Sequence, residues 1–194
     1  MVVPPPAAGG PWRIRPGEAH LWVCSPWEVR GLGVLSAEEM QRWARIVPDD
    51  HRRAFAAAHV LLRRALTWCL PSVPESDWVF RQDKPLSRPE VAGPVGNGVL
   101  RFNLSHAKDL VAVVATLHSA CGVDVEAIPD EETCARLAKP VFSGPELAQW
   151  HKLPQSERGD RFCRLWTLKE ATTKAQGLGL SVPFSSIEFA LTDS

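Results

Sequence analysis

The sequence lacks an excess of charge of either sign, a long apolar run and a paired-cysteine motif. Lysine and arginine total 22 and aspartate and glutamate total 22, so the 194-residue chain has a formal net charge of zero. Such a chain has no bulk attraction for nucleic acid or for an anionic membrane. The longest apolar run, at 110–117, is far shorter than the ~20 residues of a membrane-spanning helix. We therefore expect neither a nucleic-acid partner nor a membrane partner.

The N-terminus and the cysteines give no sign of export. Residues 1–11 are rich in proline, glycine and alanine and lack a basic segment followed by an apolar one, so we expect a flexible lead-in and no signal peptide. The five cysteines are an odd number and form no CxxC pair, which favours free thiols in a reducing compartment. A chain of this length buries roughly 70% of its unfolded surface without disulfides. The expected location is the cytoplasm.

Capping and periodicity predict two helices early in the chain. The segment 36–39 (Ser-Ala-Glu-Glu) is a capping box that opens a helix ending near Pro48. A second helix starts near Asp49 or Asp50 and stops before Pro71. Its apolar stripe at helical spacing consists of Phe55, Ala58, Leu62, Leu66 and Cys69. Around these helices we expect strands at 19–24, 78–81, 100–104 and 110–116, the last two as an antiparallel hairpin, and a loop at 84–98.

The rest of the chain is predicted to alternate strands and helices. Residues 122–126 favour a strand, and the segment 143–146 (Ser-Gly-Pro-Glu) is a second capping box that opens a short helix. A long helix is expected over about 157–176, because Gly177 stands where a C-terminal cap glycine belongs. A final strand is predicted over 186–191.

An internal echo suggests two similar halves. The segments 72–80 and 181–189 match at five of nine positions, and each follows a long helix. Chance is one explanation of so short a match; duplication is the other. Duplication predicts an α+β fold with pseudo-symmetric halves, at 12–118 and 119–194, each a long helix on a small antiparallel sheet with the site between them. On this reading the second half lacks its closing strands.

The pentapeptide 122–126 (Gly-Val-Asp-Val-Glu) holds a pair of acidic side chains. On a strand, Val123 and Val125 would face the core while Asp124 and Glu126 share the opposite face. Neighbouring carboxylates repel each other unless a cation lies between them. An all-oxygen pair suits Mg²⁺ completed by phosphate and water. The alternative is an edge strand with a solvated acidic face.

A helical triplet follows in the last long helix. Trp166, Glu170 and Lys174 are spaced i, i+4, i+8, so they share one face. Glu170 is a candidate third oxygen ligand, and Lys174 a candidate phosphate ligand. The alternative is an ordinary i, i+4 salt pair worth about 0.2–0.5 kcal/mol.

The Ser105–His106 dipeptide ends a predicted strand. Adjacent side chains make a poor nucleophile and base, and no G-x-S-x-G elbow is present, so binding of phosphate oxygens is the better reading. The alternative is turn capping by Ser105.

Basic side chains cluster on the second helix and in the loop after it. A guanidinium forks well onto phosphate, so one or two members are candidate anion ligands, while most are expected to be solvated. No Walker A loop accompanies them. The members are Arg52, Arg53, Arg63, Arg64 and Lys84.

Taken in order, these motifs resemble one enzyme family. N-L-S-H, then G-V-D-V-E, then L-W-T-L-K-E-A-T-T-K, with an upstream D-K-P at 83–85, resemble the Sfp-type 4′-phosphopantetheinyl transferases over about 36–191. The resemblance implies transfer of the 4′-phosphopantetheine arm of coenzyme A to a serine of an acyl or peptidyl carrier protein, with release of adenosine 3′,5′-bisphosphate. The implied cofactor is Mg²⁺, with Mn²⁺ as a substitute.

The resemblance also implies a role for each motif residue. Asp124, Glu126 and Glu170 would surround the metal, with Asp124 also in the coenzyme A site. Glu170 would take the proton of the attacking serine and Lys174 would contact the phosphate. The remaining coenzyme A ligands would be Ser105, His106 and Lys84, with Arg53 on the adenosine 3′-phosphate. The acidic carrier would dock at 131–155, which borders the site.

Two other readings remain open. The chain ends before the additional strands that family members usually have, so it is a candidate for an inactive remnant that binds coenzyme A or the carrier. The second is another metal-dependent phosphodiester enzyme, against which the lack of a His-rich metal cluster argues. We expect a monomer unless an unpaired sheet edge pairs with another chain.

Overall fold

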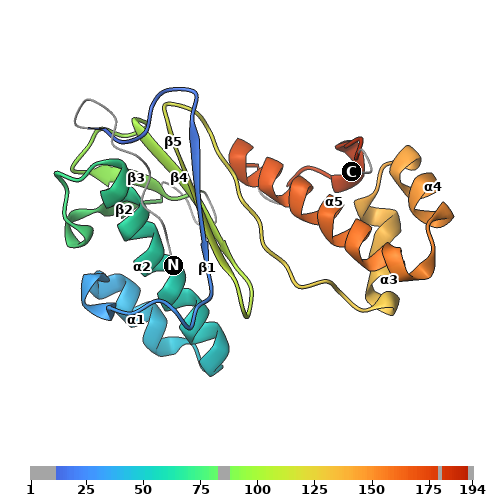
Figure 1. The fold of residues 1–194 in the computed structure, drawn as a ribbon, viewed down its shortest axis with the longest axis horizontal. Coiled ribbons are helices and arrows are strands. Elements are labelled where there is room, and N and C mark those ends of the chain that lie inside the picture. The colour runs from blue at the N-terminus through green and yellow to red at the C-terminus, as the bar shows by residue number, and fades with distance from the viewer. Residues whose placement is uncertain (1–11, 83–87, 179–180, 192–194) are drawn as a thin grey trace.

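The structure, a computed structural model, describes residues 12–82, 88–178 and 181–191. The fold is α+β, as predicted, and its two parts lie side by side (Figure 1). The predicted lead-in 1–11 and Lys84 lie outside the described residues. In chain order the elements are β1 (Ala19–Cys24), α1 (Ala37–Arg45), α2 (Asp49–Cys69), β2 (Val79–Arg81), β3 (Glu90–Gly93), β4 (Leu100–His106), β5 (Val111–Leu117), α3 (Glu131–Val141), α4 (Gly144–Lys152) and α5 (Gln155–Gln176).

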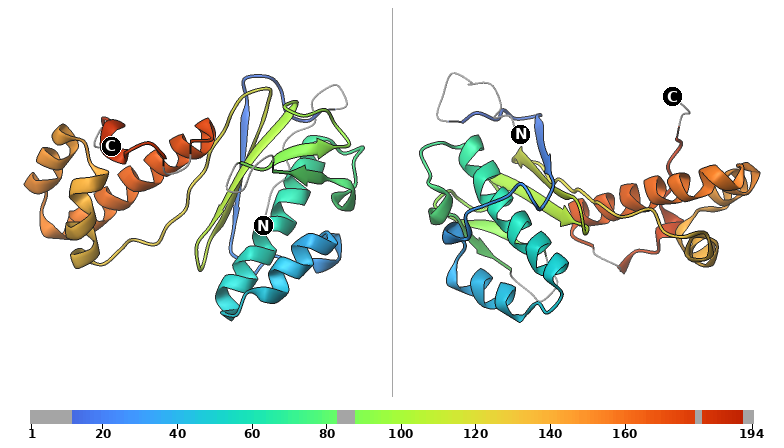
Figure 2. Two further views of the ribbon diagram at one scale, coloured as in Figure 1. Left: turned by 180° about the vertical axis from the view of Figure 1, so that it is seen from behind. Right: turned by 60° about the horizontal axis from the view of Figure 1, so that its bottom comes forward.

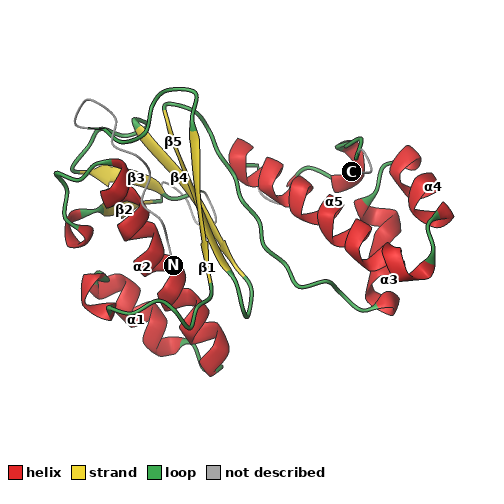
Figure 3. Ribbon diagram, in the orientation of Figure 1, coloured by secondary structure: helices red, strands yellow, loops and turns green. Residues whose placement is uncertain are grey.

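The first part is an antiparallel sheet covered by one long helix. The strand order is β1-β5-β4, with β5 in the centre (Figure 3). Side chains on one face of the sheet, such as Trp22 and its partner Val113, pack against α2 and form its core with the buried stripe of that helix. β4 pairs antiparallel with β5, which confirms the predicted hairpin. Because side chains alternate along a strand, Asn103 and Ser105 point to the opposite face.

A buried ion pair joins α1 to α2. The predicted capping box is present, with the Ser36 amide donating to Glu39 and the Glu39 amide donating to Ser36. Glu39 also accepts from Arg63 at 2.8 Å and lies 2.9 Å from His59 Nδ1. Arg63 is 2% exposed and donates further to backbone carbonyls, among them that of Trp78. The expectation that most arginines of this helix are solvated is therefore wrong for Arg63, because its burial is matched by these acceptors.

The second part is built from α3, α4 and α5, with a core that shares no residue with the first. The predicted capping box of α4 and the left-handed cap at Gly177 are both present. Lys169 is fully buried on α5, and its ammonium group reaches Glu146 of α4 at 2.5 Å. It also donates to the carbonyls of Val141, Phe184 and Ile187. One lysine thus ties α5 to α3, α4 and the C-terminal segment.

Two predicted strands are wrong. Residues 122–126 and 186–191 belong to no ladder. The former runs between β5 and α3, and the latter begins at the last residue of a short 3-10 helix, Phe184–Ser186. A strand requires a neighbour, and neither segment meets one in the described part of the chain. Val123 and Val125 are accordingly only half-buried. The structure also adds β3, inside the predicted loop, and α3, which the sequence did not predict.

The echo segments share a local form. Pro74 and Pro183 are both extended, and each precedes a short 3-10 turn, at Glu75–Asp77 and Phe184–Ser186. Beyond this the halves differ, because α3–α5 carry no strand within the residues described. The pseudo-symmetry of the halves and the loss of closing strands stay predictions. Among the residues described, no helix combines the length and apolar character needed to cross a bilayer.

The C-terminal end of α5 brings the two parts together. Figure 2 shows this end of the helix pointing at the sheet in both views. Arg88, just before β3, donates to the carbonyl of Ala175 at 3.1 Å, and Lys174 reaches residues of the first part. We call this contact region between the two parts the seam. The segment after β5 also passes through it and contains the acidic pentapeptide 122–126.

Candidate functional site

Three polar side chains from three elements meet at the seam. Ser105 comes from β4, Asp124 from the segment after β5 and Lys174 from α5. The Ser105 hydroxyl donates to Asp124 Oδ1 at 2.9 Å, and Lys174 Nζ lies 2.5 Å from the same oxygen and 3.2 Å from Ser105 Oγ. These residues, chosen from separate motifs of the sequence, therefore form one cluster.

The acidic segment is held in place from both sides. Asn103, two residues before Ser105 and on the same face of β4, accepts a hydrogen bond from the Val123 amide at 3.0 Å. On the other side, Gly122 lies against α5 so closely that a Cβ there would come within 1.9 Å of the Ala171 carbonyl oxygen. Glycine is thus the residue that this approach permits. The sequence analysis quoted Asn103 within its motif but gave it no role.

Asp124 is buried and only half satisfied. Its side chain is 3% exposed, yet Oδ2 has no hydrogen-bond partner. A buried carboxylate oxygen without a partner costs free energy unless a further donor or a cation binds it. Asp124 therefore keeps one buried carboxylate oxygen that could accept a further donor or a cation.

Two further carboxylates interact with Asp124. Burial raises the pKa of Glu126, and the negative charge of Asp124 raises it further, against the opposing effect of Lys174. Burial also raises the pKa of Glu170; Lys174 opposes this, while Asp124 and Glu126 add to it. Mutual repulsion of this kind is relieved by a bound cation.

The donors fit a hard divalent cation, although they are not drawn together as a ready-made site. Among the residues described, no three His, Cys, Asp or Glu side chains stand close enough to hold a metal ion. The donor chemistry of Asp124, Glu126 and Glu170 is nevertheless all oxygen, which Mg²⁺ prefers, and Asp124 Oδ2 is unpartnered. The chemistry of these donors therefore fits Mg²⁺, while their described positions do not form a complete coordination site.

Lys174 and Trp166 of the helical triplet have different partners. Lys174 pairs with Asp124, so the reading as an ordinary Glu170–Lys174 salt pair is not what the geometry gives. Trp166 stacks on Phe162 and meets Phe184 edge-on. It also lines a small apolar pocket of about 130 Å³ beside Glu126, with Ala127, Pro129, Leu137, Phe162 and Cys163.

His106, at the end of β4, lies among positive charges. Burial lowers its pKa, and His59, His51 and Lys174 lower it further. A bound phosphate would offset the positive charge of Lys174 and could accept a hydrogen bond from the His106 ring, so the end of β4 suits an anion.

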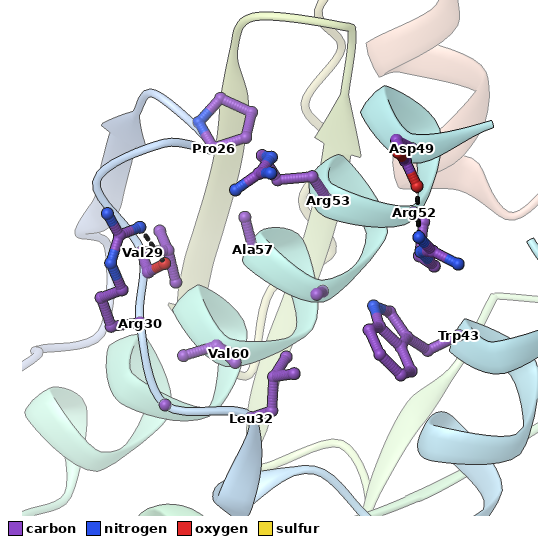
Figure 4. A pocket seen from close by; sticks show the side chains of 12 residues that line it. Pro26, Val29, Arg30, Leu32, Trp43, Asp49, Arg52, Arg53, Ala57 and Val60 are labelled. Atoms are coloured by element: carbon purple, nitrogen blue, oxygen red, sulfur yellow. Dashed lines mark hydrogen bonds and ion pairs between the residues drawn. The ribbon is translucent and has the colours of Figure 1, made fainter.

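Arg53 and Lys84 do not join this cluster in the described residues. Lys84 lies outside them, so its predicted role stays a prediction. Arg53 instead borders a separate pocket between α1, α2 and the segment after β1 (Figure 4). Its predicted contact with an adenosine 3′-phosphate likewise stays a prediction.

The sequence analysis missed Lys169, which lies next to Glu170 in the chain. Its ammonium group fixes the α5 turn that presents Glu170 and Lys174. Its position between Trp166 and Glu170 in the quoted motif was the sequence signal that could have drawn attention to it. Its partner Glu146 belongs to the capping box of α4 and also accepts a hydrogen bond from the Phe189 amide at 2.8 Å.

Comparison with known proteins gives a consistent picture. A profile described as 4′-phosphopantetheinyl transferase superfamily matches residues 120–194. The 4′-phosphopantetheinyl transferase HetI of Nostoc sp. is 32% identical over 81% of this chain and 65% of its own length. The 4′-phosphopantetheinyl transferase of Bacillus subtilis is 31% identical over 86% of this chain and 70% of its own length. AcpT of Salmonella typhimurium, also a 4′-phosphopantetheinyl transferase, is 33% identical over 67% and 62%, respectively. The chain thus spans 62 to 70% of the length of these relatives.

Proposed function

The chain belongs to the 4′-phosphopantetheinyl transferase superfamily, and from this premise we propose that it transfers the 4′-phosphopantetheine arm of coenzyme A to a serine of an acyl or peptidyl carrier protein. The other product would be adenosine 3′,5′-bisphosphate. The observation that carries the proposal is the buried Asp124 carboxylate, which shares one oxygen with Ser105 and Lys174 and leaves the other open.

Asp124, Glu126 and Glu170 would hold Mg²⁺, or Mn²⁺ in its place. When bound, the metal neutralises the pyrophosphate of coenzyme A and stabilises charge on the leaving group. The raised pKa values of Glu126 and Glu170 support this assignment, because burial and the neighbouring charges disfavour ionised carboxylates at the seam without a cation.

The side chains of β4 and α5 would bind the phosphates. Ser105 Oγ and Lys174 Nζ lie 3.2 Å apart, close enough for one phosphate group to contact both. His106 would add a third contact, and Lys84 and Arg53 would complete the coenzyme A site.

Glu170 would act as the general base for the incoming serine. It would accept the proton of the carrier's serine hydroxyl, directly or through water, as that oxygen bonds to the phosphorus of the phosphopantetheine. The bond from this phosphorus to the adenosine 5′-phosphate oxygen then breaks. Because a bound Mg²⁺ lowers the basicity of a carboxylate that coordinates it, a water between Glu170 and the serine hydroxyl would relay the proton.

The carrier protein would dock beside α3 and α4, which span most of the predicted region 131–155. The support is the apolar pocket at Glu126, to which Leu137 of α3 and Trp166 of α5 contribute. An apolar recess next to the reacting groups suits the apolar contacts found at the centre of a protein interface.

The test is a transfer assay with coenzyme A, Mg²⁺ and an apo carrier protein, read by the mass of the carrier. We expect the serine to gain phosphopantetheine, and Glu170→Gln to slow the transfer about 100-fold or more. The matched control is Glu157→Gln, an exposed glutamate in the first turn of the same helix, which should leave the rate unchanged.

The other outcomes identify the rival functions. Binding of coenzyme A with no mass gain would mean a binding protein. Breakdown of coenzyme A without a carrier would mean a phosphodiester hydrolase. Full transfer by Glu170→Gln would overturn its role as base while leaving the transferase assignment standing.

A further inference from the structure

Arg88 is a buried arginine that joins the first part of the molecule to the last turn of α5. Its side chain is 10% exposed, and its guanidinium donates to the carbonyl of Ala175 at 3.1 Å. The last carbonyls of an α-helix have no amide donor within the helix, and a positive charge at this end also interacts favourably with the helix dipole. Ala175 follows Lys174 in the chain, so this hydrogen bond holds the backbone from which the Lys174 side chain extends.

Glu90, the first residue of β3, fixes the orientation of the Arg88 guanidinium. Nε of Arg88 donates to Glu90 Oε1 at 3.0 Å, and Nη2 donates to the same oxygen. The remaining nitrogen, Nη1, is the one that reaches Ala175. A guanidinium is planar and its donors have fixed directions. Because Glu90 holds one edge of the group, Nη1 points in one direction, toward α5.

The Arg88 network and the Lys174 cluster both include side chains of β4. Arg101 of this strand lies 4.0 Å from Glu90. Ser105, four residues further along and on the same face of the strand, accepts from Lys174 at 3.2 Å. The last turn of α5 is therefore bound to the first part at two points, once through its backbone and once through the Lys174 side chain.

Arg88 is committed to protein acceptors, which distinguishes it from a phosphate ligand. All three of its guanidinium nitrogens donate to Glu90 or to the Ala175 carbonyl. Lys174, by contrast, is partly exposed at the seam. A molecule bound there would contact the lysine, while the arginine would act only through the turn that carries it.

We propose that Arg88 is a positioning residue of the transfer site, which holds the carbonyl of Ala175 and thereby places the Lys174 ammonium group. That group lies beside Ser105 and Asp124, where the proposed function puts a phosphate of coenzyme A. The inference therefore rests on the proposed function. A displacement of about 1 Å in such a group can slow a reaction about 100-fold, so the loss of one backbone hydrogen bond is enough to matter.

The experiment is a double-mutant cycle of Arg88→Gln and Lys174→Met, read by the carrier mass assay. We expect Arg88→Gln to lower kcat/KM at least about tenfold in the native chain and less than about twofold in the Lys174→Met background. Arg88→Lys keeps the charge but cannot fork onto Glu90 while it reaches Ala175, so it should still lower kcat/KM at least about fivefold. The matched control is Arg45→Gln, on an exposed arginine at the end of α1, which should leave the rate unchanged.

Three results of this assay would overturn the inference. The first is a native rate for Arg88→Gln. The second is a loss by the same factor in both backgrounds, since Arg88 would then not act through Lys174. The third is a native rate for Arg88→Lys, since the charge alone would then account for the effect.

A native chain that gives no transfer would contradict the proposed function, and the same four chains would then test the inference by urea unfolding, which needs no substrate. Lys174→Met should lose less than about half as much free energy of unfolding in the Arg88→Gln background as in the native chain, because its ion pair with Asp124 depends on the held turn. Equal losses would overturn the inference. If Arg88→Gln alone fails to fold because Glu90 is left without its partner, Arg88→Gln combined with Glu90→Gln removes both charges and replaces it in the cycle.

Discussion

Lys174 Nζ lies 2.5 Å from Oδ1 of Asp124, while Oδ2 of the same carboxylate is buried without a partner. The ion pair joins α5 to the segment after β5, so it also joins the two parts of the molecule. Its second oxygen is therefore able to accept a further donor or a cation.

Asp124→Asn is expected to abolish metal-dependent behaviour. The amide has the same shape but no charge, so Mg²⁺ should no longer raise the melting temperature and transfer should fall at least about 100-fold. Scanning calorimetry with and without Mg²⁺ and the carrier mass assay measure the two effects. Asp130→Asn is the control, because Asn also caps a helix and Asp130 caps α3. Equal Mg²⁺ responses in both variants would contradict the assignment.

Lys174→Met is expected to destabilise the chain by about 1–3 kcal/mol, because it leaves the buried Asp124 carboxylate without its cation. The lower part of that range allows for the 29% exposure of the lysine side chain. Urea unfolding measures the loss. Lys152→Met, on an exposed lysine at the end of α4, should change the free energy of unfolding by less than about 0.5 kcal/mol. A similar small change for both would mean that the seam does not depend on this pair.

Glu170 gives a pH dependence of stability in the metal-free protein. Burial raises the pKa of Glu170 above its value in the unfolded chain. The protonated side chain therefore favours the folded state, and this contribution to the free energy of unfolding is lost as pH rises from the unfolded pKa toward the folded pKa. In EDTA at neutral pH, Glu170→Gln should therefore melt about 1–3 °C higher than the native chain, and the difference should disappear below about pH 4. A variant that melts lower at neutral pH would refute this sign.

Gly122→Ala tests the close approach of the acidic segment to α5. A Cβ at this position would overlap the Ala171 carbonyl oxygen, so the segment must move, at a cost of about 1–3 kcal/mol. Transfer should fall as well, because Asp124 moves with the segment. Gly144→Ala is the control, because a Cβ there meets nothing within 4 Å. Retention of both stability and activity by Gly122→Ala would show that the seam is looser than described.

Glu39 should govern acid unfolding of the first part. Burial alone would raise its pKa, but hydrogen bonds from His59, Ser36 and Arg63 outweigh burial and lower it to about 2. Its stabilising contribution is therefore complete above the unfolded pKa near 4.5 and is lost as pH falls toward 2. Glu39→Gln should cost about 3 kcal/mol at pH 7 and much less at pH 2. The control is Glu38→Gln, on the exposed neighbour, and a constant cost across this range would contradict the prediction.

The sequence predicted the elements whose signals are local. The capping boxes at Ser36 and Ser143 and the C-terminal cap at Gly177 each depend on residues within one turn, and all three are present. α3 had such a signal too, since Asp130 caps it through the Thr133 amide. Pro140 near its end obscures the helical pattern.

Features that depend on distant neighbours could not be predicted in this way. The alternation of apolar and acidic residues at 122–126 is expected both for a β-strand and for an isolated extended segment. The two differ only in whether a neighbouring strand pairs with the segment. Arg63 and Lys169 have the sequence spacing of solvated residues, yet both are buried, because carbonyl groups from other segments accept hydrogen bonds from them. The cluster of Ser105, Asp124 and Lys174 was inferred from the family resemblance and not from spacing.

The two hydrophobic cores share no residue, and the polar cluster lies where they meet. A molecule bound by Ser105 of the first part and by Lys174 of the second would therefore link two parts that have separate hydrophobic cores. Binding of such a molecule would restrict the motion of the two parts relative to each other, and its release would restore that motion. Motion of one part relative to the other should therefore decrease when a ligand binds at the cluster.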